Sequence, residues 1–369
     1  MSSCIVRAPA AGGEQGEMAA LNDDDRLLLE GTYWWGPATL FRCDLETDPA
    51  ACDLALVGVP HSSGNGSTER DQHLGPRAVR HVSALQRRMH AGFGFSPWEV
   101  ARIRDLGDVP LPEANNNEQC IERIARFFER IGAAGTRAVS IGGDHSITGG
   151  ILRGLASESS ALTGGEPVAL VHLDAHIDAY ESLAHWFGAR DSAAHWASYL
   201  VREGRVDPRA SVQIGMRGNP RTASWLDPSY ELGYEVVPMS RYRELGPDAC
   251  VDLIRARTGD RPIYVTFDLD CLDATVAPAA ANLEPAYTGW TVDEAFGLLR
   301  GLRDLNVIGG DVVCLVPTKD SPNGITAMVA AAAMFEILSL AADSGVSRAA
   351  KQGQETGAQI PTARGPGPG

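Results

Sequence analysis

The chain has 369 residues, 44% of them hydrophobic, and a formal net charge of −15. This size supports one large core or at most two domains, and so acidic a surface makes nucleic acid and anionic membranes unexpected partners. The seven cysteines contain no CxxC pair, and we find no signal peptide and no apolar run of membrane-spanning length. We therefore expect a cytoplasmic protein with free thiols.

The two ends differ in composition from the rest of the chain. Residues 1–30 are small, polar and acidic, which predicts a flexible N-terminal extension. Residues 345–369 are rich in Gly, Pro and Gln, which predicts a disordered tail. Residues 31–344 contain no recognisable linker and predict one folded domain.

Strands and helices alternate along this domain. In chain order the predicted elements are a strand at 53–60, a helix at 118–131, strands at 137–144, 167–176, 211–218, 234–240 and 262–270, a helix at 291–304, a strand at 306–317 and a helix at 325–340. Most of the strands are continuously apolar and β-branched, as in strands covered on both faces. The helix at 291–304 opens with a capping box formed by Thr291 and Glu294. The alternation predicts a mostly parallel, doubly wound sheet with helices on both faces.

Three of these strands end in clusters of acids and histidines. The clusters are Asp144 with His145, then His172 with Asp174, His176 and Asp178, then Asp268 with Asp270 and Asp273. Alternate residues point the same way as a strand leaves a sheet, so the members of a cluster are expected to converge. Carboxylates gathered in one cleft need a compensating cation, and this oxygen-rich set with two imidazoles suits a pair of divalent metals. The absence of thiolates argues against structural zinc.

Each cluster also has a simpler interpretation. An acid after a strand is often a helix cap, and a short run of acids and histidines can be a solvated loop. Three such clusters, each at the end of an apolar strand, favour a functional site at the carboxyl edge of the sheet.

The motifs GGDHS, DAHID and DLDCLD resemble the three signatures of the ureohydrolases, the superfamily of arginases and agmatinases. The resemblance spans residues 35–343 and implies a three-layer α/β/α sandwich, a ureohydrolase catalytic domain over 31–344 and a binuclear metal centre. The ligands it implies are His145, Asp174, His176, Asp178, Asp268 and Asp270. Within this set, Asp174 and Asp268 are similar to the bridging pair of the family.

The resemblance also implies a mechanism. Metal-bridging hydroxide attacks the planar carbon of an amidine or guanidine, and Asp270 relays the proton to the departing nitrogen. Histidine proton shuttles are common in this family on the loop after the second signature, where this chain offers His185 and His195. Packing beside Trp186 or Trp196 is the competing interpretation of these two histidines.

The segments that hold substrate in the family depart here from its pattern. Ala-Ala-Ala-Asn at 279–282 replaces a Gly/Thr turn, and Cys314 stands where the family carries a Glu that clasps the guanidinium. We expect Cys314, Asn282 and Trp290 to contact the substrate. The aromatic residues near 31–42 and 287–290 either narrow the pocket around a planar cation or pack an interface.

The stretches GTYWWG, NLEP and DVVCLVPTKD resemble most the branch of free-guanidine and biguanide (metformin) hydrolases, which implies nickel, with manganese as the alternative. We therefore expect a hydrolase of guanidine or a biguanide that uses two divalent metal ions per subunit. The alternatives are an agmatinase or guanidinobutyrase that releases urea, a formimino-group hydrolase, and a non-catalytic partner subunit of a hetero-oligomer. The resemblance also implies a trimer or hexamer. The oligomer is either a homo-oligomer or a hetero-oligomer with a related subunit.

Overall fold

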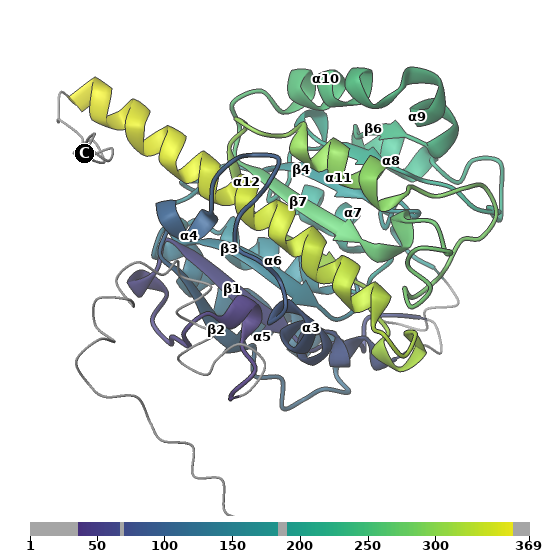
Figure 1. The fold of residues 1–369 in the computed structure, drawn as a ribbon. Coiled ribbons are helices and arrows are strands. Elements are labelled where there is room, and N and C mark those ends of the chain that lie inside the picture. The colour runs from purple at the N-terminus through teal and green to yellow at the C-terminus, as the bar shows by residue number, and fades with distance from the viewer. Residues whose placement is uncertain (1–35, 67–69, 184–189, 357–369) are drawn as a thin grey trace, which may run out of the picture.

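The computed structural model describes residues 36–66, 70–183 and 190–356, which form an α/β sandwich around one sheet (Figure 1). The sheet has eight strands, all parallel, in the order β2-β1-β3-β8-β7-β4-β5-β6. The strands are β1 (Leu54–Val59), β2 (Ile103–Asp108), β3 (Arg137–Gly142), β4 (Ala169–Leu173), β5 (Val212–Ile214), β6 (Glu235–Val237), β7 (Ile263–Asp268) and β8 (Val307–Val313).

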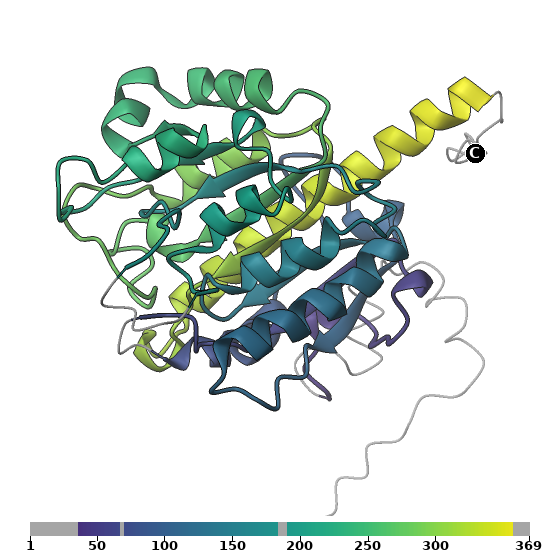
Figure 2. The same cartoon turned by 180° about the vertical axis from the view of Figure 1, so that it is seen from behind.

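Helices cover both faces of the sheet (Figures 1 and 2). One face carries α3 (Gly75–Ser83), α4 (Pro97–Val100), α9 (Met239–Leu245), α10 (Pro247–Thr258), α11 (Val292–Arg300) and α12 (Ile325–Thr356). The other carries α5 (Asn117–Ala133), α6 (Ile147–Leu155), α7 (Trp196–Arg202) and α8 (Asp227–Leu232). These helices confirm the predicted three-layer sandwich with a doubly wound sheet.

Most strands are largely apolar because both of their faces are buried. In β1, Leu54 and Leu56 pack into the core beneath α3 and α12, whereas Ala55, Val57 and Val59 pack into the core beneath α5 and α6. Successive side chains of a strand point to opposite faces, so each core receives every second residue. A continuous apolar run is therefore the expected signature of these strands.

The strand β2 is absent from the elements predicted above. It lies at the edge of the sheet and pairs with β1. Its sequence, IRDLGD, carries polar side chains, and the carboxylate of Asp105 is buried against the guanidinium of Arg80 at 3.1 Å. The charge of Asp105 is paired with Arg80 of α3, so this edge strand can carry a buried acid. It therefore lacks the continuous apolar pattern of its neighbours.

The last helix, α12, runs across one face of the sheet and its end projects from the body (Figure 1). Its segment Ile325–Val346 is long and apolar enough to cross a membrane, yet 83% of its most apolar window is buried inside the protein, as in a core helix. The helix continues to Thr356, past the boundary predicted at residue 344. The predicted extension at 1–30 lies outside the described residues.

Candidate metal centre

The three clusters meet at the carboxyl edge of four adjacent strands, β3, β8, β7 and β4. Asp174 follows β4 directly, Asp268 is the last residue of β7, and Asp270 lies in the short turn η6 (Leu269–Cys271). His145 follows β3 after a Gly-Gly-Asp turn. In open α/β sheets, this edge is where ligands bind.

The turn after β3 depends on a close approach of two backbones. A Cβ atom at Gly143 would lie 2.2 Å from the carbonyl oxygen of His61, so no larger residue fits without a shift. Asp144 accepts hydrogen bonds from the backbone N–H groups of Gly64 at 2.8 Å and Ser146 at 3.0 Å. Asp144 therefore ties this turn to a neighbouring loop, and His145 is the residue left facing the cleft.

The hydrogen bonds around His145 determine which ring nitrogen carries its proton. The hydroxyl of Thr266 donates to Asp311 Oδ1 at 2.6 Å and lies 2.8 Å from His145 Nε2. Because the hydroxyl proton is committed to Asp311, Thr266 accepts from Nε2–H of His145. In the neutral imidazole, the form that binds a metal, Nδ1 is then the unprotonated nitrogen, with its lone pair directed into the cleft.

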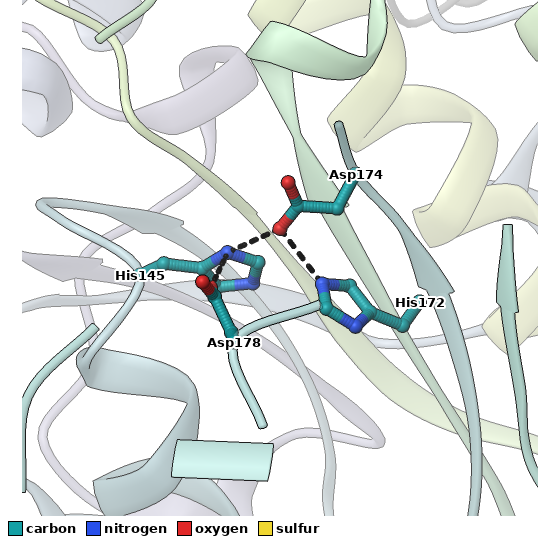
Figure 3. A group of neighbouring side chains, drawn as sticks. All are labelled: His145, His172, Asp174 and Asp178. Carbon is teal, nitrogen blue, oxygen red and sulfur yellow. Dashed lines mark hydrogen bonds and ion pairs between the residues drawn. The ribbon is translucent and has the colours of Figure 1, made fainter. Parts of the chain in front are cut away.

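Three carboxylate oxygens surround His145 Nδ1. The Oδ2 atoms of Asp174, Asp178 and Asp268 lie 2.9, 3.0 and 3.1 Å away; the first two are drawn in Figure 3. Among the described residues, Nδ1 nevertheless has no hydrogen-bond partner of acceptable geometry. A lone pair facing several carboxylate oxygens is the arrangement of a divalent metal site.

A second group of donors adjoins the first and shares Asp174 with it. His176 Nδ1 lies 3.4 Å from Asp174 Oδ1 and 3.0 Å from Asp270 Oδ2. The ligand atoms of Asp174, His176 and Asp270 lie within 4.8 Å of one another, as do those of the first group, which is His145, His172, Asp174 and Asp178. Each oxygen of Asp174 thus faces a different group, so this carboxylate is placed to bridge two ions. The donor set fits a pair of divalent metals.

His172 also lies in the first group, but its hydrogen bonds give it a different part (Figure 3). The side-chain amide nitrogen of Gln213 donates to Ile177 O at 2.7 Å and lies 3.0 Å from His172 Nδ1. Nδ1 of His172 is therefore the acceptor, and Nε2–H donates to Asp174 Oδ2 at 2.7 Å. With its proton on Nε2, His172 orients the carboxylate of Asp174 and offers that oxygen a hydrogen bond in place of a lone pair to an ion.

The electrostatics of the cluster show why it needs cations. Burial raises the pKa of Asp270 well above its usual range, and the charges of Asp268 and Asp174 raise it further. Burial also raises the pKa of Asp268. Burial lowers the pKa of His145, but the neighbouring carboxylates outweigh it, so that this pKa rises well above its usual range. Without metals the site would hold protons, which divalent cations displace.

A pocket of about 760 Å³ opens above the cluster. Its floor contains His145, His176, Asp178, Asp268 and Asp270. Its walls include Asn282, Cys314, Glu284, Arg221, Tyr180 and Trp225. The structure therefore brings all six residues of the predicted ligand set together beneath one pocket.

Two predicted substrate-binding residues, Cys314 and Asn282, do line this pocket. Both have left-handed backbone conformations, with φ of 69° and 56°, and Asp178 in the floor has φ of 48°. Such conformations are costly for residues other than glycine and are concentrated at functional sites.

Backbone hydrogen bonds attach the segment 279–282 to the chain leaving β8. Ala281 N–H donates to Cys314 O at 2.8 Å, and Val316 N–H donates to Ala279 O at 2.7 Å. Ala280 and Leu315 form an antiparallel bridge between these contacts. The two walls of the pocket that carry Asn282 and Cys314 are therefore one connected unit.

The structure does not bring Trp290 into the pocket. Its side chain is fully buried in the core, where its ring lies edge-on to Tyr242 at a centroid distance of 5.3 Å. The sequence shows a bulky aromatic near a substrate loop, but it does not show that the ring turns inward under α11. Tyr287, in the same loop, is 70% exposed.

The two histidines predicted as proton shuttles have different outcomes. His185 lies outside the described residues. His195 is buried, with Nδ1 at 2.7 Å from Ser192 Oγ, and it is not among the described residues that line the pocket. Its neighbour Trp196 has the direct contact with the site, because its indole N–H donates to Asp178 Oδ2 at 3.0 Å.

Sequence reasoning missed several residues that support the site. Trp196 and Thr266 hold Asp178 and His145 in place, and Glu284 lies in the pocket wall. Thr266 precedes Asp268 by two positions in one strand, so strand periodicity could have identified it. For Glu284, the signal is an isolated acid in the loop that follows the third motif.

Comparison with known proteins places this geometry in context. The family model of the arginase family matches residues 52–339. Guanidinopropionase of Pseudomonas aeruginosa is 37% identical over 316 residues, covering 85% of this chain and 94% of that protein. Mitochondrial agmatinase of Gallus gallus is 32% identical over 305 residues, covering 82% and 85%. The structure of proclavaminate amidino hydrolase from Streptomyces clavuligerus is similar with a TM-score of 0.77 and 30% identity, covering 85% and 99%.

Proposed function

This chain belongs to the arginase family of metal-dependent amidinohydrolases, and we propose that it cleaves a C–N bond in a small guanidine-type cation with two divalent metal ions. The observation that carries this proposal is the pair of donor groups that share Asp174 beneath a pocket. The residues that would hold the ions are His145, Asp174, His176, Asp178, Asp268 and Asp270, with Asp174 shared by the two donor groups.

When bound, the two ions supply an activated water and polarise the substrate. Residues of the chain then position the substrate and transfer protons. Asp270 Oδ2 is buried and has no hydrogen-bond partner of acceptable geometry among the described residues. We assign to Asp270 the transfer of a proton to the departing nitrogen, since its carboxylate borders the pocket at the cluster. His195 and His185 remain the proposed proton shuttles to solvent.

The first candidate substrates are free guanidine and a biguanide such as metformin. Burial raises the pKa of the Cys314 thiol well above its usual range, and the charges of Asp268 and Asp270 raise it further. Cys314 therefore places an uncharged side chain where an ordinary agmatinase has a carboxylate that binds the guanidinium. This difference supports a substrate that another group binds. The resemblance of the surrounding segments to the guanidine and biguanide hydrolase branch supports the same choice.

A second candidate is a guanidino compound with a tail, as in an agmatinase or guanidino acid hydrolase. The pocket of about 760 Å³ leaves room for a tail, and Arg221 in its wall suits a carboxylate. The names of the relatives, guanidinopropionase and agmatinase, support this candidate. A non-catalytic partner subunit is disfavoured, because the complete donor set is brought together.

We favour nickel over manganese because of the branch resemblance, although both metals accept this donor set. We also propose a trimer or hexamer in the cytoplasm. The six cysteines among the described residues are buried free thiols, which supports a reducing compartment.

The test is a product assay on the purified chain loaded separately with nickel and manganese. The substrates are guanidine, metformin, agmatine, 3-guanidinopropionate, 4-guanidinobutyrate and arginine, and the products measured are urea, guanylurea, ammonia and dimethylamine. Turnover of guanidine or metformin supports the first candidate. Turnover confined to tailed compounds supports the second. No turnover with either metal, while both ions are bound, contradicts the proposed hydrolase.

A further inference from the structure

One carboxylate in the pocket lining, that of Glu284, is not among the proposed metal ligands. The proposed ligand set contributes four carboxylates, which two divalent cations would balance, and Arg217 and Arg221 add positive charge to the lining. A cationic substrate then needs a further negative partner. Among the described residues that line the pocket, Glu284 is the one acid outside that ligand set.

Glu284 borders the metal cluster directly. Its Oε1 atom lies 3.4 Å from Nε2 of His176, and its side chain is 28% exposed. A contact of this length is weak, so the carboxylate keeps acceptor capacity for a donor in the pocket. The neighbouring wall residue Cys314 carries no carboxylate, so Glu284 has no acidic neighbour outside the ligand set among the described residues of this lining.

The backbone opposite Glu284 is shaped to admit its carboxylate. Gly218 has φ of 99°, and a Cβ atom there would lie 2.3 Å from Glu284 Oε2. A larger residue at 218 would therefore be strained and would also displace this oxygen. Oε1 of Glu284 thus lies beside His176, and Oε2 occupies the space that a side chain at position 218 would fill.

We propose that Glu284 binds the guanidinium group of the substrate and selects for a planar cation. This inference rests on the proposed function, because it needs a guanidine-type substrate above the metal cluster. A guanidinium has N–H donors in a plane that match the two oxygens of a carboxylate. Glu284 then supplies the carboxylate that the wall position of Cys314 lacks.

The decisive variant is Glu284→Gln, which keeps the size of the side chain and an oxygen acceptor for His176 but removes the charge. We expect the KM for the guanidine-type substrate to rise roughly 10- to 100-fold, as for the loss of a hydrogen bond between charged groups. Metal content, measured by mass spectrometry, should equal that of the unchanged chain. The matched control is Glu244→Gln, because Glu244 is exposed on α9, away from the pocket lining.

A binding measurement separates this inference from the proposed function. Titration calorimetry compares guanidinium with urea, its neutral analogue of similar shape, on the metal-loaded chain and on Glu284→Gln. We expect the variant to weaken guanidinium binding and to leave urea binding unchanged. One outcome is that the unchanged chain turns over no guanidine compound and still binds guanidinium more tightly than Glu284→Gln does. In that case the proposed reaction is wrong, but the role of Glu284 in binding the cation is supported.

Two results overturn the role of Glu284. Equal binding of guanidinium to both proteins, or no binding to either, shows that this carboxylate does not hold the cation. Loss of metal from Glu284→Gln with an unchanged KM in the loaded fraction shows that Glu284 only orients His176.

Discussion

Nε2 of His172 lies 2.7 Å from Oδ2 of Asp174, the carboxylate that both candidate metal-binding groups share. Because Gln213 fixes the proton on this nitrogen, the proposed metal centre would feel His172 through Asp174. We expect His172→Phe to lower metal affinity about 10- to 100-fold, the usual effect of losing such a support. Competition with a coloured chelator measures the change, and complete loss of one ion would mean that His172 is itself a ligand.

Removing a proposed ligand should have a larger effect. We expect Asp174→Asn and His145→Ala to reduce turnover to background, since each breaks a donor group. The far-ultraviolet circular dichroism should stay unchanged, because both residues follow strands and are not part of them. Full activity in either variant contradicts the metal mechanism.

Metal removal should destabilise the folded chain. The cluster buries carboxylates beside one another, and their mutual repulsion is relieved by bound cations. Free metal at about a thousand times its Kd adds about 4 kcal/mol of stability to the folded state. Thermal unfolding with a chelator, followed by metal addition, should show a reversible rise in Tm. An unchanged Tm would indicate that the cluster binds no ion tightly.

The thiol of Cys314 should be dispensable for the chemical step. Burial and neighbouring carboxylates raise its pKa, so it stays neutral and is a poor nucleophile. We expect Cys314→Ala to keep part of its activity, with kcat/KM within about tenfold of the original. Complete loss of turnover with both ions bound would show that the thiol takes part in the reaction.

Trp290 offers a contrast between stability and binding. Its ring is fully buried beside Tyr242, so Trp290→Ala should lower the free energy of unfolding by about 3–5 kcal/mol. Trp290→Phe should retain most of the packing and leave KM unchanged. A selective rise in KM for Trp290→Phe, without a loss of stability, would restore the substrate-binding interpretation.

Much of the fold is predictable because most strands are continuous apolar runs buried on both faces. Seven of the eight strands lie within the segments predicted as strands, whereas β2 carries polar side chains and places Asp105 against Arg80. The convergence of the acids and histidines is predictable because parallel strands end at one edge of the sheet. Each cluster directly follows an apolar strand in the sequence, so its position at this edge of the sheet can be predicted.

The pocket walls are less predictable because they depend on how loops turn. Trp290 and Glu284 lie six residues apart in one loop region, yet one ring points into the core and the other side chain lines the pocket. Proton positions depend on long-range partners as well. The tautomer of His145 follows from Thr266 and Asp311, which are far from it in sequence.

The attachment of segment 279–282 to the chain after β8 has an evolutionary consequence. These contacts are made by backbone groups, so they do not depend on side-chain chemistry, although the left-handed conformations of Asn282 and Cys314 restrict which residues fit. Substitutions at 282 and 314 are nevertheless coupled mechanically, since a shift of one backbone moves the other. Changes of substrate in this lineage should therefore arise by paired, non-additive substitutions across the bridge, and a double-mutant cycle between these positions measures that epistasis.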